Sequence, residues 1–335
     1  MAEFAKFVAM RAGMAVFTLL LVSLIVFTLM EMVPGDCAER YLAFKNTQGS
    51  QITVEDIEAE RVRLGLDKPY LQRWVTWVGN VVFKGDFGDS CILRVSINQL
   101  LSDKFLISLG ICLAALLLAY IIAIPAGIVA ATAKSALVNN SLRFLSYLGL
   151  AMPNFLLALM IMLFSTVVFG DSLTGLFSKE YRDAEWSYDR VMDFLSRAWL
   201  PVFILGWSAT AFALQTVRAL MSDEIGKLYV TAAAARGVSG GRLLWRYPAR
   251  HALGPIVNSL GFDLNRIFNE LPIVALIMTL TESGALLIEA LARSNDQQLA
   301  GAIIFLLTAS IVALNFFTDI LLAVLDPRVR KGILG

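Results

Sequence analysis

The sequence is poor in charged residues and in the side chains that most often perform catalysis or bind metals. Charged residues make up only 16% of the chain, whereas about 25% is usual for a soluble domain. One histidine and three cysteines fit neither a zinc site nor a disulfide-rich secreted domain. The motifs H-E-x-x-H, G-x-S-x-G and G-x-x-x-x-G-K-[ST] are absent as well. These absences argue against an enzyme, a metal site and ATP hydrolysis by this chain, and a net charge of +1 gives no indication of nucleic acid binding.

Long apolar runs are abundant. Hydrophobic residues make up 58% of the 335 residues, and the mean hydropathy is +0.70. A bilayer core needs about 20 apolar residues per helix, and we identify six candidate spans: 13–32, 105–131, 144–169, 199–220, 256–280 and 299–325. The first follows Lys6 and Arg11 but is too long for a signal peptide, so we expect an uncleaved span. The expected fold is an all-α polytopic membrane protein with about six transmembrane helices.

The charges of the connecting segments predict the orientation. With the N-terminus inside, segments 1–11, 132–143, 218–254 and 326–335 are cytoplasmic and hold 13 Lys/Arg and 4 Asp/Glu. The external segments 33–104, 170–198 and 281–298 hold 14 Lys/Arg and 19 Asp/Glu. Nine of those 14 basic residues lie in the first loop, which is too long to follow the positive-inside rule. Both termini are therefore predicted to be cytoplasmic. The predicted parts are 1–32 with the first helix, an external loop 33–104 with amphipathic helices, and a core 105–335 that includes a cytoplasmic loop at 221–255.

Two of the predicted spans carry unusual residues. Small residues that let another helix approach closely in lipid recur every fourth position of the second span, at Ala115, Ala119, Ala123, Gly127 and Ala131. The fifth span contains Asp263, Arg266 and Glu270, which share one helix face. A charge at the bilayer centre costs roughly 2.5–3.5 kcal/mol, so such residues face protein or water. They either line a translocation path or gate, or form an internal ion pair that packs the span.

The cytoplasmic loop between the fourth and fifth spans contains a run of small residues. Thr231 to Ala235 are Thr and Ala only, and Gly237 predicts the left-handed stop of a helix C-terminus. Arg242, Arg246 and Arg250 then recur every fourth residue, which predicts one basic helix face. A basic loop without any partner is the alternative to a partner-binding surface.

This loop resembles the EAA loop of ABC importer permeases, the coupling helix that docks into the ATPase subunit. Residues 229–237, Y-V-T-A-A-A-A-R-G, are similar to the Y-V-R-T-A-R-A-K-G of the dipeptide/oligopeptide type (the peptide/nickel/opine family), and H-A-L-G-P at 251–255 is similar to its N-A-L-x-P. Five further motifs match in order: V-P-G-D at 33–36, L-G-L-D-K-P at 64–69, G-D-F-G-D-S at 85–90, M-P-N-F at 152–155 and L-D-P-R-V-R at 325–330. The resemblance covers nearly the whole chain. T-E-S-G at 281–284 departs from it, because the family has Pro-Gly-Leu-Gly there.

The resemblance implies a type I ABC importer permease of the bacterial inner membrane, working in the lipid bilayer with a second permease subunit, two ATPase subunits and a periplasmic substrate-binding protein. It implies no cofactor on this chain, since ATP and Mg are used by the ATPase subunits. The substrate it implies is a di- or oligopeptide, with an opine, an oligosaccharide or a nickel complex as alternatives. The implied ATPase-coupling residues are Tyr229, Thr231, Ala232, Ala233, Gly237, Arg242 and Arg246. The candidate pathway or gate residues are Asn154, Asp263, Arg266 and Glu270.

Two questions stay open at the level of the sequence. Cys37 and Cys91 both lie in the predicted periplasmic loop, where a disulfide and two separate thiols are both compatible with the compartment. Cys112 in the second span is expected to be a packing residue.

An ion-coupled secondary transporter is a rival interpretation, but it requires internal repeats and broken helices that the sequence does not display. An intramembrane enzyme is a second rival, for which Asp263 and Glu270 are the only candidate reactive groups.

Overall fold

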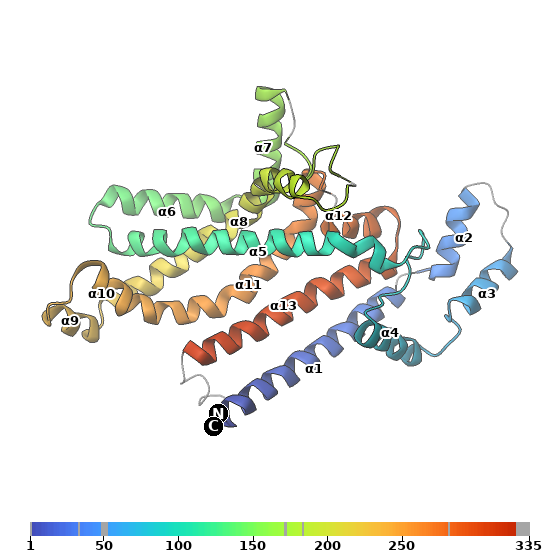
Figure 1. Ribbon diagram of the computed structural model, residues 1–335, viewed down its shortest axis with the longest axis horizontal. Coiled ribbons are helices and arrows are strands. Elements are labelled where there is room, and N and C mark those ends of the chain that lie inside the picture. The colour runs from blue at the N-terminus through green and yellow to red at the C-terminus, as the bar shows by residue number, and fades with distance from the viewer. Residues whose placement is uncertain are drawn as a thin grey trace. The chain divides into compact units, whose positions relative to one another are not determined.

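The computed structural model describes residues 2–32, 34–47, 53–170, 173–182, 184–280 and 282–325 (Figure 1). Within these ranges every regular element is a helix, apart from an isolated bridge between Asp89 and Ser96. The expected all-helical class is therefore confirmed. Parts of three matched or compared motifs lie outside the described residues, namely Val33, Thr281 and residues 326–330.

The chain divides into two compact units, each of which has its own packing. Unit one comprises residues 1–12, 109–280 and 313–335, and unit two comprises residues 13–108 and 281–312. The helices in chain order are α1 (Ala2–Met32), α2 (Cys37–Thr47), α3 (Val54–Arg63), α4 (Tyr70–Lys84), α5 (Ile97–Thr132), α6 (Ala136–Ala151), α7 (Asn154–Phe169), α8 (Tyr188–Ile225), α9 (Leu228–Ala235), α10 (Gly240–Arg246), α11 (Pro248–Ile277), α12 (Ser283–Ile288), the π-helix η1 (Glu289–Arg293) and α13 (Gln297–Leu325).

Helices occupy all six predicted spans, but they differ in how well they suit a bilayer. Four are long and apolar enough to cross a membrane, namely α1, α5, α8 and α13. A fifth span results if α6 and α7 are taken together. α11 is long enough but carries the three charges predicted for the fifth span. A polar helix of this kind is stable in a membrane only where protein or water covers its charged face.

The predicted span 144–169 is broken, which corrects the expectation of one continuous helix. α6 and α7 meet at an angle of 96°, and α7 turns sharply away from α6 (Figure 1). Pro153 explains the break, because a proline pushes the residue before it out of helical geometry. Met152 accordingly has φ −100° and ψ 112°.

The small-residue face of α5 packs against α8, as its spacing predicts. Ala115, Ala119 and Ala123 are completely buried. A Cβ atom added at Gly206 of α8 would lie 3.0 Å from the carbonyl oxygen of Ala115, so the two backbones lie very close. This close approach supplies the van der Waals packing that holds helices together in lipid.

The two ends of the chain contribute to unit one next to α11. Arg11 of α1 forms an ion pair with Asp319 of α13, with 2.9 Å between nitrogen and oxygen. A Cβ atom on Gly261 of α11 would lie 1.6 Å from the amide oxygen of Asn315 in α13. A side chain at position 261 would therefore displace the side chain of Asn315 from its place in this crossing.

Local chemistry explains the helix boundaries at the start of unit two. Thr53 caps α3 through a capping box with Asp56, which satisfies two of the free amide groups of the first turn. Pro69 stands directly before α4. The indole nitrogen of Trp74 in α4 donates a hydrogen bond to Ser23 of α1 at 3.3 Å, so the amphipathic α4 lies against α1.

Glu282 occupies the turn where the sequence departs from the family pattern. Its side chain is 1% exposed and accepts hydrogen bonds from the amide of Gly284 and the hydroxyl of Ser108, each at 2.7 Å. The first of these bonds caps the start of α12. Burial raises the pKa of Glu282, and the hydrogen bonds from Ser108 and Gly284 offset only part of that effect.

We expect Glu282 to make the protein less stable as pH rises. A raised pKa means that the folded state holds this proton more tightly than the unfolded state, so stability is full below the ordinary value of 4.5 and is lost as pH rises through the folded-state pKa. Glu282→Gln should flatten the dependence of the melting temperature on pH between 5 and 8, measured on the detergent-solubilised protein. Glu55→Gln, at an exposed position of α3, is the control and should leave it unchanged. Equal slopes in the wild type and Glu282→Gln would contradict this assignment.

Candidate functional site

The small-residue run forms a short helix, α9, with the predicted stop at its end. Gly237 has φ +85°, a left-handed conformation that glycine adopts at little cost. The amide of Gly237 donates to the carbonyl of Ala234 at 2.9 Å, and the amide of Val238 donates to that of Ala233 at 3.2 Å. These two bonds form a Schellman motif, which satisfies carbonyl groups left open at the helix end.

α9 presents a bare face to its surroundings. Thr231 and Ala232 are exposed, and Leu228 at the start of the helix is 87% exposed. Val230 and Ala233 are 5% exposed and pack inward. Ala233 therefore does not lie on the free surface, although the resemblance implies a contact there. An exposed leucine beside small side chains allows a partner surface to approach the helix backbone closely.

Tyr229 ties α9 to both of the long helices that flank it. Its hydroxyl donates a hydrogen bond to Glu224 near the end of α8, and Glu224 also pairs with Lys227. The ring of Tyr229 meets the ring of His251 in α11 edge to face, with 5.1 Å between centroids. Burial, followed by the hydrogen bond to Glu224, raises the pKa of Tyr229 to about 12. The hydroxyl therefore stays protonated and donates throughout the physiological range.

The three arginines that follow do not share one helix. α10 ends at Arg246, and Tyr247, with φ −113° and ψ −80°, separates it from α11. Arg242 and Arg246 lie on α10, whereas Arg250 lies in the first turn of α11, and all three are exposed. The predicted continuous basic face is therefore wrong, because Pro248 starts a new helix after Tyr247.

We expect Tyr229→Phe to loosen α9 without unfolding the protein. The substitution keeps the ring on His251 but removes the donor to Glu224, a contribution of about 1 kcal/mol for a partly exposed hydrogen bond. Amide hydrogen exchange in α9 should become roughly fivefold faster. Tyr247→Phe removes a hydroxyl from the same loop and serves as the control. Unchanged exchange in α9 would show that Tyr229 does not anchor this helix.

The charged residues of α11 lie in a polar cluster inside unit one. Asp263 is completely buried and accepts a hydrogen bond from the hydroxyl of Tyr120 in α5 at 2.5 Å. The same hydroxyl lies 2.9 Å from Ser259. The second carboxylate oxygen of Asp263 has no hydrogen-bond partner among the described residues. Burial of such an oxygen is costly, so this side of the cluster is suited to a change of partner.

Arg266 does not form the expected ion pair. Its guanidinium lies over the ring of Phe212 in α8, 4.3 Å from the centroid. Across the described ranges, no ion pair within 4.0 Å joins Arg266 to Asp263 or Glu270. The internal ion pair, which was one of the two sequence interpretations, is therefore not formed in this conformation, because the aromatic face takes the place of the carboxylate.

Asn154 lies in the packing of unit one. It is 1% exposed, and its amide nitrogen donates to the carbonyl of Leu205 in α8 at 3.1 Å. Its amide oxygen accepts from the backbone amide of Ser208 at 3.2 Å. Both ends of the side chain are thus used to fix the start of α7 to α8.

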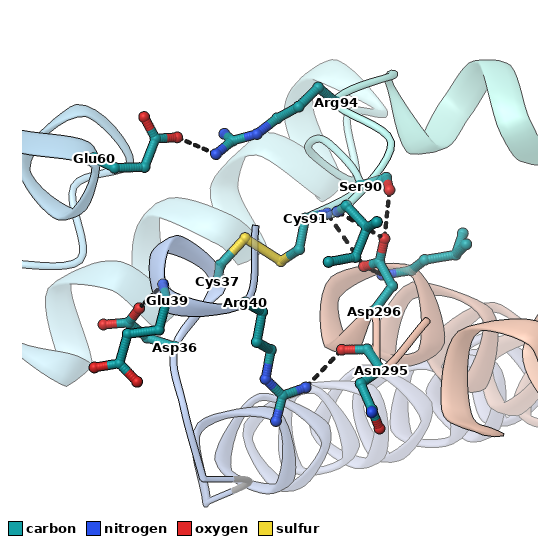
Figure 2. The surroundings of a disulfide bond; sticks show 12 residues. Asp36, Cys37, Glu39, Arg40, Glu60, Ser90, Cys91, Arg94, Asn295 and Asp296 are labelled. Carbon is teal, nitrogen blue, oxygen red and sulfur yellow. Dashed lines mark hydrogen bonds and ion pairs between the residues drawn. A yellow bond between two sulfur atoms is a disulfide. The ribbon is translucent and has the colours of Figure 1, made fainter. Parts of the chain in front are cut away.

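Cys37 and Cys91 are joined by a disulfide in unit two, with 5.3 Å between their Cα atoms (Figure 2). Cys37 begins α2, and Cys91 lies in the turn that precedes α5. Cys112 is buried in α5 and lies apart from this bond.

Sequence reasoning missed the residues that position the site. Tyr120, Glu224 and Ser259 belong to no motif, and their partners lie on other helices. The one available indication was the position of Tyr120, which follows Ala119 and so lies at the edge of the small-residue face of α5.

Comparison with known families gives two matches. The family described as "Binding-protein-dependent transport system inner membrane component" matches residues 123–331. The N-terminal part of such membrane components matches residues 4–96. Together these matches include α9, the charged residues of α11 and both cysteines of the disulfide.

Several curated proteins are similar along almost their whole length. The oligopeptide transport system permease protein AppB of Bacillus subtilis is 27% identical over 97% of this chain and 99% of its own. The di/tripeptide transport system permease protein DppB of Pseudomonas aeruginosa is 28% identical over 97% of this chain and 98% of its own. The dipeptide transport system permease protein DppB of Escherichia coli is 25% identical over 97% of this chain and 98% of its own.

One solved structure has the same fold. A chain of the MetNI methionine ABC transporter, in an inward-facing conformation, superposes with a TM-score of 0.53 and 14% identity. The match covers 68% of this chain and 97% of that chain. An ABC importer permease fold therefore accounts for about two thirds of the chain.

Proposed function

Because the chain belongs to the family of binding-protein-dependent transport system inner membrane components, we propose that it is the permease subunit of an ATP-driven importer. In this proposal the chain carries a solute across the inner membrane and has no catalytic activity of its own. It works with a second permease subunit, two ATPase subunits that use ATP and Mg, and a periplasmic substrate-binding protein. The observation that carries the proposal is the exposed face of α9 with its stop at Gly237.

The proposed cargo is a di- or oligopeptide. It is supported by the curated relatives, which are named as oligopeptide, di/tripeptide and dipeptide permeases. The mixed charges of Asp263, Arg266 and Glu270 also suit a zwitterion. An opine, an oligosaccharide or a nickel complex remains the alternative cargo within the same kind of importer, and ligand screening of the cognate binding protein decides among them.

The proposed coupling runs from α9 into unit one. ATP binding closes the ATPase subunits, which move α9 through its exposed residues Thr231 and Ala232. Tyr229 passes this motion to α8 through Glu224 and to α11 through His251. Because α8 and α11 pack against each other, a shift of α9 displaces the helices that hold the polar cluster.

Two internal contacts support the proposed orientation in the membrane. The ion pair between Arg11 and Asp319 requires the start of α1 and the end of α13 to lie on one side of the membrane, as expected with both termini inside. The disulfide between Cys37 and Cys91 suits an oxidising compartment, as expected for the loop after α1.

We expect Gly237→Asp to uncouple the importer. An ordinary residue at φ +85° costs about 1–2 kcal/mol of backbone strain, so the end of α9 should be rebuilt. Uptake and the stimulation of ATPase activity should fall, whereas the affinity of the binding protein for substrate should not change. Both rates are measured with the reconstituted complex.

Gly226→Asp is the matched control for this variant. Gly226 lies at the other end of α9, so this variant adds the same charge next to the same helix. The φ of Gly226 is −76°, where a side chain fits. Normal uptake by Gly237→Asp would refute the coupling assignment. Uptake that followed an ion gradient and ignored ATP would instead favour a secondary transporter.

We also propose that Asp263, Arg266 and Glu270 line the path or act as its gate, against the alternative that they only pack α11. Arg266→Gln keeps much of the side-chain volume and removes the charge held over Phe212. A path or gate residue should change uptake severalfold while the melting temperature of the complex moves by less than about 2 °C. A lower melting temperature with normal uptake per folded complex would favour packing. Asn265→Ala, at an exposed position of α11, is the control.

A further inference from the structure

A buried carboxylate next to the disulfide carries an inference of its own. Asp296 is 1% exposed and stands directly before the first residue of α13 (Figure 2). It accepts hydrogen bonds from the amide of Leu299 at 3.1 Å, and its carbonyl accepts from the amide of Ala300 at 3.0 Å. Asp296 therefore caps the N-terminus of α13 in the way that aspartate commonly does.

The remaining partners of the Asp296 carboxylate come from the turn that contains Cys91. The hydroxyl of Ser90 donates to one carboxylate oxygen. The backbone amides of Cys91 and Ile92 donate to the carboxylate at 3.3 and 3.4 Å. Among the described residues, no cation forms an ion pair with Asp296. The buried charge therefore depends on neutral donors whose positions are set by the shape of this turn.

α2 is linked both to the turn that contains Cys91 and to the residue before Asp296. Cys37, its first residue, is bonded to Cys91 of the turn (Figure 2). Arg40, one helical turn later, donates to the carbonyl of Asn295 at 2.6 Å. The neighbours Asn295 and Asp296 are thus linked to α2 by two routes, one direct and one through the disulfide.

The order of the residues in the chain gives the disulfide a particular part in assembly. The two cysteines are 54 positions apart in the first third of the chain. Asp296 follows Cys91 by 205 residues. The loop can therefore be closed before Asp296 has been synthesised, so that the turn already has its final shape when α13 arrives.

We propose that the Cys37–Cys91 disulfide is a maturation cross-link that pre-forms the seat of Asp296 and so fixes the start of α13. The proposal rests on the orientation given under the proposed function, which places both cysteines outside the cytoplasm. The partner it implies is a thiol–disulfide exchange protein of an oxidising compartment. A thiolate of this chain attacks the disulfide of that protein and forms a mixed disulfide. The second thiolate displaces the exchange protein as a dithiol, and two protons pass from the cysteines to it.

Peptide mapping under non-reducing conditions tests the cross-link in protein purified from its host membrane with thiols blocked at lysis. The expected result is a disulfide-linked pair of peptides that contain Cys37 and Cys91, and a single shift in mass after reduction. Blocked thiols at both positions would overturn the proposal.

A double-mutant cycle tests the link from the disulfide to Asp296. Melting temperatures of the full chain in its complex are measured for the wild type and for five variants: Asp296→Asn, Cys37→Ser with Cys91→Ser, all three substitutions together, and the controls Cys112→Ser and Asp67→Asn. Asp296→Asn should lower the melting temperature clearly when the disulfide is present and much less when it is absent, because the seat is already lost. Additive effects would overturn the proposal. Asp67→Asn, at an exposed site of the same unit, and Cys112→Ser are the controls and should change little.

Hydrogen exchange supplies a readout that does not require any variant to fold. In the wild-type complex, reduction should speed exchange at the amides of Leu299 and Ala300 roughly fivefold, as expected when a helix loses its cap. Exchange in α9, at the other candidate site, should stay unchanged. Exchange at residues 299 and 300 that did not respond to reduction would overturn the proposal. If transport fails but reduction still speeds exchange at Leu299 and Ala300, the result counts against the proposed function alone.

Discussion

The structure depends on how closely helices can approach α8. In lipid, apolar side chains gain nothing by leaving the solvent, so helices associate through close packing of their backbones. α8 provides that approach on two sides. Gly206 lies against the carbonyl of Ala115 in α5, and a Cβ atom on Gly149 of α6 would lie 2.6 Å from Ala211. Because α7 and α11 also pack on α8, this helix contacts four other long helices of unit one: α5, α6, α7 and α11.

Buried polar groups then determine what can move around that centre. Asn154 uses both ends of its amide on the backbone of α8, so the start of α7 is firmly fixed. The cluster around Asp263 is different, since one carboxylate oxygen has no partner among the described residues and Arg266 rests on an aromatic ring. A polar network that is only partly satisfied is easily rearranged. The part of α11 that carries the charges is therefore better suited to change than the part of α7 that carries Asn154.

The sequence predicted what local chemistry decides. The small-residue face of α5 and the left-handed stop at Gly237 follow from residue types at fixed spacing, and the structure contains both. The family resemblance followed from motifs in order. Predictions failed where a proline interrupted an apparent period, as at Pro153 and Pro248, because a periodic pattern does not reveal a change of helix axis.

Contacts between distant parts of the chain were the least accessible. The spacing of Asp263, Arg266 and Glu270 predicted a shared face. Nothing in that spacing indicated that the guanidinium of Arg266 would lie over the ring of Phe212 in α8. Burial of Ala233 likewise depends on how α9 is anchored, which Tyr229 and its partners on α8 and α11 determine. The small residues of α9 are thus evident from the sequence, whereas their burial and the residues that hold this helix in place appear only in the structure.

The two units are stabilised by interactions of different kinds, and this difference bears on function. In unit two, a covalent bond and a fully buried carboxylate hold the turn at Cys91 and the start of α13. In unit one, α9 is held by a partly exposed ion pair, one hydroxyl, one ring contact and the inward packing of Val230 and Ala233. Exposed pairs of this kind contribute at most about 1 kcal/mol, and only two side chains of α9 are buried, so α9 can shift at less cost than a cross-linked segment. Regions of low local stability are the ones that move in response to a partner. A helix anchored as lightly as α9 is therefore suited to follow a motor protein, while the start of α13 is suited to remain still.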